Sequence, residues 1–149
     1  MKKYFKISAL LLVIFISSIY PQQKNLIQKT DVKKQVVVDS VIFDEIENAI
    51  SAGDVSKISK YLGSQTYFSL TNGINGYYST NQAYYVLEEF FKLYRVTKFK
   101  MNIIKTDISN PYATGTYFYD YRGRRGSAQV YVSLTRSGNN WNISQLTIN

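Results

Sequence analysis

Four consecutive segments in the second half of the chain have the alternating pattern of β-strands, and they limit the possible folds more than any other feature. They cover residues 97–107, 112–121, 127–136 and 141–148. In the first segment Phe99, Met101 and Ile103 are separated by lysine or asparagine. Short polar connections rich in glycine and asparagine separate the segments, so we expect an antiparallel meander. The alternation predicts a sheet with one face covered and the other in contact with water.

Two helices are predicted ahead of this sheet. The first spans about 39–52, where apolar residues recur at three- and four-residue steps: Val38, Ile42, Ile46, Ala49 and Ile50. Gly53 is suited to ending this helix, and Asp54 is suited to capping the start of a second, short one. The second helix should turn Val55, Ile58 and Leu62 inward.

A strand and a third helix are predicted next. Residues 65–70 are β-branched and aromatic enough for a strand, and Asn72-Gly73 and Asn75-Gly76 indicate turns after it. Ser79 and Gln82 have the spacing of a capping box. The helix that follows, about 83–94, collects its apolar residues on one arc: Ala83, Val86, Leu87, Phe90, Phe91, Leu93 and Tyr94.

The N-terminus has the composition of a secretory signal. Lys2, Lys3 and Lys6 precede an apolar stretch at 7–19. This stretch is much shorter than the ~20 residues that span a membrane, so we expect no transmembrane anchor after cleavage. We assign residues 1–22 to the signal peptide, 23–36 to a linker and 37–149 to a single domain, and expect export to the periplasm or the exterior. An uncleaved interfacial anchor remains the alternative.

The composition restricts the chemistry. The chain has no cysteine and no histidine, so a disulfide, a thiolate nucleophile and the usual zinc ligands are all excluded. The acidic residues never take the alternating spacing of a calcium loop, so we expect no metal and no cofactor. The formal net charge of +8 favours either an anionic partner or simple solubility. No nucleic-acid-binding motif is present, so nucleic acid is not an expected partner.

The order of these elements resembles the nuclear transport factor 2-like fold, also called ketosteroid isomerase-like or cystatin-like. The segments that carry the resemblance are 49–62, 76–83, 87–91 and 141–148. More narrowly, residues 38–149 resemble a group of exported bacterial domains of unknown function on that fold. The resemblance implies an α+β class in which three N-terminal helices pack on a curved antiparallel sheet to form a cone. In that fold the open end of the cone often holds an apolar ligand, and the sheet often forms a dimer face.

Catalysis on such a fold would need a carboxylate or histidine inside the cone as a general base. The candidates are Glu45, beside the apolar arc of the first helix, and Asp120, on a strand among tyrosines. The competing interpretation is that Glu45 reaches solvent and Asp120 pairs with Arg122 near a hairpin. No catalytic set is convincing.

Aromatic residues could line a cavity that suits a small planar or lipid-like ligand. These pocket candidates are Tyr67, Phe90, Tyr94, Tyr117, Tyr119, Tyr131 and Trp141. The alternative is that they fill the cone or cover a dimer interface, where tyrosine is also enriched.

Three arginines lie close together between two predicted strands, at Arg122, Arg124 and Arg125. Arginine binds phosphate and carboxylate well, so these residues are anion-binding candidates; a merely solvated turn is the alternative.

Taken together, the sequence predicts a non-catalytic module of the cell envelope that binds a small apolar ligand or a protein. A homodimer through the sheet is one arrangement of such a module. The alternative is a small enzyme of the isomerase or hydrolase type that acts on an apolar molecule through a pocket carboxylate.

Overall fold

The computed structural model describes residues 40–149, which belong to a compact unit spanning Gln35–Asn149. The signal peptide assigned to 1–22 and the linker assigned to 23–36 lie outside the described residues, as does the predicted first helical residue, Asp39.

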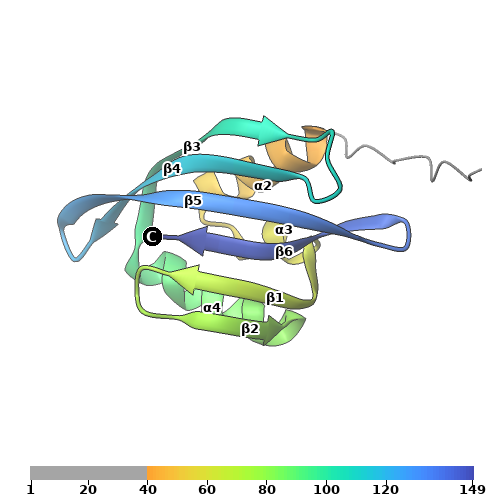
Figure 1. The fold of residues 1–149 in the computed structure, drawn as a ribbon. Helices are drawn as coiled ribbons and strands as arrows, with labels where there is room; N and C mark the ends of the chain where they lie inside the picture. Colours follow the sequence, from red (N-terminus) through yellow and green to blue (C-terminus); the bar gives the residue numbers. More distant parts are fainter. Residues whose placement is uncertain (1–39) are drawn as a thin grey trace, which may run out of the picture. The chain divides into compact units, whose positions relative to one another are not determined.

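Three helices and six strands make up the described part of the chain. In chain order they are α2 (Ser40–Ala52), α3 (Val55–Ser59), β1 (Leu62–Leu70), β2 (Asn75–Ser79), α4 (Thr80–Leu93), β3 (Arg95–Lys105), β4 (Tyr112–Tyr121), β5 (Arg124–Ser137) and β6 (Asn140–Ile148). The strands form one curved sheet in the order β2-β1-β6-β5-β4-β3, which can be followed from bottom to top in Figure 1. The predicted α+β class is confirmed.

One strand pair departs from the antiparallel arrangement that the resemblance implied. β1 runs parallel to β6, while the other four pairs are antiparallel, so the sheet is mixed. Parallel neighbours need a long crossover between them, and here β2, α4 and the β3–β5 meander supply it. The register of this pair shifts between Leu62 and Tyr67, where the buried Thr66 hydroxyl donates a hydrogen bond of 3.0 Å to the Ile143 carbonyl.

All three helices lie on the same face of the sheet, as Figure 1 shows. The core forms between the helices and this face, and its largest fully buried side chains include Tyr117, Phe43, Phe68 and Phe90. The alternation predicted for 127–136 is confirmed on β5, where Ala128, Val130, Val132 and Leu134 are all buried. Phe43 was not among the predicted core residues of the first helix, and Leu93, which was predicted on the apolar arc of the third, is 43% exposed.

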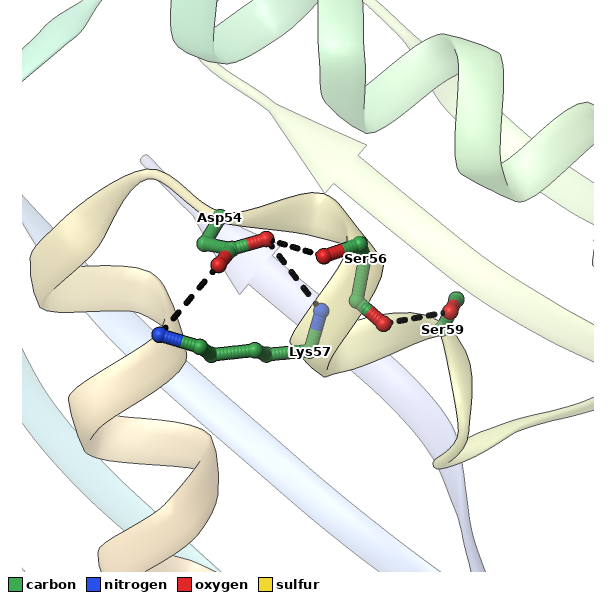
Figure 2. A network of polar contacts seen from close by, with 4 residues as sticks. All are labelled: Asp54, Ser56, Lys57 and Ser59. Atoms are coloured by element: carbon green, nitrogen blue, oxygen red, sulfur yellow. Dashed lines mark hydrogen bonds and ion pairs between the residues drawn. The ribbon is translucent and has the colours of Figure 1, made fainter.

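The junction between α2 and α3 follows the sequence prediction. Gly53 takes a positive φ of 62°, which a residue with a side chain adopts only with strain, and it ends α2. Asp54 caps α3: its carboxylate accepts hydrogen bonds from the Ser56 hydroxyl at 2.5 Å and the Lys57 amide at 3.3 Å (Figure 2). Lys57 also places its Nζ 3.3 Å from the same carboxylate. The short α3 is therefore capped by a polar network at its surface, while Val55 and Ile58 anchor it in the core.

The start of α4 also matches its prediction. The Ser79 amide donates to Gln82 Oε1 at 3.0 Å, which is the backbone half of a capping box. Further along the helix, Glu88 and Lys92 form an ion pair at 3.3 Å.

Three local predictions are wrong. Asn75-Gly76 does not form a turn but begins strand β2, and the connection between β1 and β2 is Thr71–Ile74. Asparagine and glycine are poor strand formers, so the propensity pattern hid this short edge strand.

The second error concerns Ile103, which was predicted to alternate with polar residues on the covered face of its strand. In β3 the register shifts between Met101 and Ile103, and this bulge turns Ile103 away from the core and leaves it 50% exposed.

The third error concerns the connection of β4 to β5. A five-residue loop was expected at 122–126, but the structure has a two-residue turn at Arg122-Gly123, and β5 begins at Arg124. Both turn residues have positive φ, 52° and 78°, as in a type I′ turn. The strands of this hairpin therefore extend almost to its tip.

Candidate functional site

Glu45 lies on the surface and not inside the sheet-helix core. Its carboxylate accepts hydrogen bonds from Lys60 Nζ and from the Tyr61 hydroxyl, so it links α2 to the end of α3. The hydrogen bond from Lys60, followed by that from Tyr61, lowers the pKa of Glu45 below its ordinary value. A general base near neutral pH needs a raised pKa, so this placement gives Glu45 a structural role.

Asp120 takes part in the β4–β5 turn. Its Oδ1 accepts a hydrogen bond of 2.9 Å from the Gly123 amide. No ion pair joins it to Arg122 within the described residues, in contrast to the predicted alternative. The carboxylate therefore stabilises a tight turn of positive φ.

Four of the seven pocket candidates come together at the C-terminal end of α4. Phe90 stacks on Tyr94 with ring centroids 5.0 Å apart, and Tyr94 meets Tyr119 edge-on at 5.1 Å. Tyr117 lies 6.1 Å from Phe90, and its hydroxyl donates to the Tyr94 carbonyl at 2.5 Å. Phe90 and Tyr117 are fully buried, and burial raises the pKa of Tyr117 far above that of a free phenol. Tyr121 was not predicted, yet it stacks on Tyr94 at 4.7 Å.

The other three pocket candidates lie elsewhere. Tyr67 alternates with the buried Thr66 and Phe68, so it points to the face of the sheet opposite the helices. Tyr131 likewise alternates with buried valines on β5 and points to that same face. Trp141 is half-buried at the start of β6 and packs against the edge of the core.

The face opposite the helices carries a set of aromatic side chains, and none of the described elements covers it (Figure 1). We call it the open face and define it by Tyr67, Tyr77, Tyr112, Phe118 and Tyr131. One register row crosses five strands from Tyr77 through Tyr67, Gln145 and Ser133 to Tyr112. Tyr67 meets Tyr77 edge-on at 5.1 Å, and Tyr112 stacks on Tyr131 at 5.6 Å. Tyr77 is 71% exposed and Phe118 is 42% exposed.

Five cationic side chains gather at the end of the sheet formed by β3, β4 and β5. We call this set the basic corner, and it consists of Arg95, Lys98, Arg122, Arg124 and Arg125. The sheet register explains the gathering, because Arg95, Asp120 and Arg125 form one row and Lys98, Phe118 and Ser127 form a neighbouring one. Arg122 lies over the Tyr121 ring at 5.2 Å. The three predicted anion-binding arginines do not share one face: Arg125 lies in a row with Asp120, whereas the adjacent residue, Arg124, pairs with Tyr121 and points to the opposite face.

A shallow depression of about 450 Å³ lies at the basic corner. Its lining residues are Thr97, Lys98, Phe118, Tyr119, Arg125 and Gly126. Gly126 fits there because a side chain would collide with the Tyr119 ring, whose Cζ would lie 2.6 Å from an added Cβ. The depression therefore combines one exposed aromatic ring with two cations.

Sequence reasoning missed Lys98, Arg95 and Phe118 as site residues. Lys98 was treated as one of the polar residues that alternate along a strand, and Phe118 was not distinguished from the other aromatic residues of 112–121. Recognising Arg122-Gly123 as a two-residue turn would have fixed the β4–β5 register and placed Phe118 beside Ser127. The β3 register could not be found in this way, because it depends on bulges.

No group of three or more acidic side chains within residues 40–149 is placed to hold a metal ion. No helix in the same range is long and apolar enough to cross a membrane.

Comparison with solved structures identifies the class of the fold. The chain resembles a nuclear transport factor 2-like protein of unknown function from Shewanella oneidensis, with a TM-score of 0.53, 11% identity, and coverage of 72% of this chain and 93% of that one. The fold is therefore nuclear transport factor 2-like, as the order of elements in the sequence predicted.

The family model described as a domain of unknown function, DUF4783, matches residues 43–149, and the chain belongs to this family. A DUF4783 family protein from Bacteroides uniformis is similar with a TM-score of 0.64 and 19% identity over 71% of this chain and 94% of that one. One from Bacteroides ovatus has a TM-score of 0.61 and 22% identity over 70% and 90%. Comparison with curated protein sequences gives no match.

Proposed function

We propose that this chain is an exported, non-enzymatic binding module whose contact surface is the open face of its sheet. The observation that carries the proposal is the set of tyrosine and phenylalanine side chains on a face that no described element covers. Aromatic residues supply large contact areas at low entropic cost and are enriched in protein interfaces. Export is supported by the lysines and short apolar stretch at the N-terminus.

The filled core favours the open face over an internal pocket as the binding site. Phe90 and Tyr117, two of the candidates for lining a cavity, have no exposed surface and contact one another and their neighbours. A small apolar ligand inside the cone would have to displace them. The partner is therefore a protein, and a second copy of the chain paired through the open face is one such arrangement.

The positions of the two candidate bases favour a binding role over catalysis. Glu45 is bound by Lys60 and Tyr61, and Asp120 is bound by the Gly123 amide. Each carboxylate is engaged in holding the fold together, and neither contacts the aromatic cluster at the end of α4 through a hydrogen bond.

Native mass spectrometry tests the proposal on the chain exported by a bacterial host that expresses the full-length sequence. We expect a complex with a second copy or a host protein, and Tyr77→Glu should abolish it because Tyr77 is the most exposed aromatic of the open face. Tyr85→Glu is the matched control, since Tyr85 is 65% exposed but lies on α4. If the wild type and both variants are all monomeric and carry no partner, the proposal that the open face is the contact surface is refuted. Substrate turnover lost in Glu45→Gln or Asp120→Asn would refute the non-enzymatic role.

A further inference from the structure

The cationic side chains of the described residues fall into two groups, those that form an ion pair with a carboxylate and those that do not. Lys57, Lys60, Lys92 and Lys100 each form an ion pair with a carboxylate. None of the five cations of the basic corner does so within residues 40–149. Asp120 is the one carboxylate in their register rows, and its Oδ1 already accepts the Gly123 amide. The basic corner therefore holds a local excess of positive charge that the fold does not neutralise.

The depression in this corner has a shape that suits an inserted side chain. Phe118 is 42% exposed and forms part of the wall of the depression, with Lys98 and Arg125 also lining it. A ring that lines a depression receives an apolar group from a partner, whereas a ring that inserts into a lipid surface must protrude. The flanking cations are placed to meet negative charges on either side of such a group.

We infer that the basic corner binds an acidic peptide segment of a partner protein, which places an apolar side chain against Phe118 and carboxylates beside Lys98 and Arg125. The inference rests on the proposed function, because it names the chemistry of a partner at one end of the open face. Charge complementarity selects the acidic segment, and the depression of about 450 Å³ offers room for an apolar side chain. Such binding weakens as salt is added, because the charges are exposed to solvent.

A defined probe for this binding is the blocked peptide Glu-Glu-Phe-Glu-Glu, titrated into the isotope-labelled chain and followed by NMR. We expect chemical-shift changes at residues 97–98, 118–119 and 125–126. The control peptides are Gln-Gln-Phe-Gln-Gln, which removes the charge, and Glu-Glu-Ser-Glu-Glu, which removes the apolar side chain. Both should bind more weakly than the probe. Equal binding of the glutamine peptide, or shift changes that lie outside the basic corner, would overturn the inference.

A charge-matched pair of double variants makes the test specific. Lys98→Gln with Arg125→Gln should weaken binding of the probe about fivefold, as expected for two solvent-exposed ion pairs. Lys105→Gln with Arg136→Gln removes the same charge from the opposite ends of the same two strands, β3 and β5, and should leave the affinity unchanged. Equal weakening by the two double variants would show that only net charge matters, and would overturn the site. Phe118→Ser should also weaken binding, with an unchanged spectrum elsewhere as the check on folding.

Three further outcomes separate this inference from the proposed function. If the chain binds phosphatidylglycerol vesicles through Lys98 and Arg125 but does not bind the probe, the acidic peptide is the wrong partner class. If the probe fails while Tyr77→Glu still abolishes a complex in native mass spectrometry, the acidic-peptide inference fails and the proposed function stands. If neither the probe nor a protein partner binds, both fail.

Discussion

Gly115, on β4, lies directly against the backbone of β3. An added Cβ would lie 2.4 Å from the Lys100 carbonyl oxygen and 3.0 Å from Met101 Cα. Both atoms belong to the backbone of β3, so they cannot move aside without distorting the sheet. The need for glycine at this position is a matter of space between strands.

Gly115→Ala should therefore lower the free energy of unfolding by about 1–3 kcal/mol, as overpacking does in other tightly packed sites. Gly63→Ala is the control: Gly63 is also a strand glycine, but an added Cβ there makes ordinary contacts, the nearest at 3.5 Å. It should leave the stability unchanged or raise it by up to about 1 kcal/mol. Urea unfolding of both variants measures the difference, and equal effects would contradict the steric argument.

Tyr117 gives a second prediction at the scale of a single residue. Tyr117→Phe keeps the buried ring but removes the hydroxyl that donates to the Tyr94 carbonyl, which should cost about 1 kcal/mol at neutral pH. Burial raises the pKa of Tyr117 in the folded chain above its ordinary value of 10.0. The unfolded chain therefore releases this proton first, so the stabilisation is complete below about pH 10 and declines as the pH rises further. Thermal unfolding at about pH 8 and about pH 11 should show the wild type losing its advantage over the variant, and a constant difference would contradict this.

Helix α2 protects the edge of the sheet along β3. The Glu47 carboxylate accepts the Met101 amide at 2.8 Å and Lys100 Nζ at 2.7 Å, and the Ser51 hydroxyl donates to the Phe99 carbonyl at 3.3 Å. The Glu47 side chain is accordingly only 14% exposed. An edge strand offers unpaired backbone groups to other chains, and these contacts occupy some of them.

Glu47→Ala should expose the Met101 amide and lower the free energy of unfolding by about 1–3 kcal/mol. Glu47→Gln retains a side-chain acceptor and should have a smaller effect. Hydrogen exchange of the Met101 amide reports the contact directly: exchange should be slowest in the wild type and fastest in Glu47→Ala. Asn48→Ala, at an exposed position of the same helix, should leave that rate unchanged. Unaltered exchange in Glu47→Ala would show that the contact does not protect the edge.

For the molecule as a whole, carboxylates that hold elements together make stability depend on pH. The hydrogen bond from Lys60 lowers the pKa of Glu45 below 4.5, and the hydrogen bond from Ser56 lowers that of Asp54 below 3.8. A depressed pKa means that the folded chain binds these protons less readily than the unfolded chain does. The stabilisation is therefore present above these ordinary values and is lost as the pH falls below them.

The double variant Glu45→Gln, Asp54→Asn should accordingly be less stable than the wild type at neutral pH and equally stable in strong acid. Urea unfolding at about pH 7 and about pH 2.5 measures the two differences. A difference that stays the same at both values would show that these carboxylates do not contribute through their ionisation.

The sequence by itself determined the elements that depend on local interactions. The helix end at Gly53, the cap at Asp54 and the box at Ser79 follow from backbone hydrogen bonds satisfied within a few residues, and the alternation in β5 follows from a sheet with one covered face. Short strand β2 escaped prediction because its first residues, Asn75 and Gly76, have weak strand propensity and are held by pairing with β1.

Only the tertiary structure decided where the site residues lie. The parallel pairing of β1 with β6, the bulges of β3 and the packing of Glu47 against an edge all depend on contacts between segments distant in the sequence. Such long-range contacts set the strand registers, and the register decides to which face of the sheet each side chain points. For this reason the predicted pocket residues divide between the core and the open face. The same registers placed Lys98 beside Phe118 and Arg125 in the neighbouring row, and no local pattern in the chain contains that arrangement.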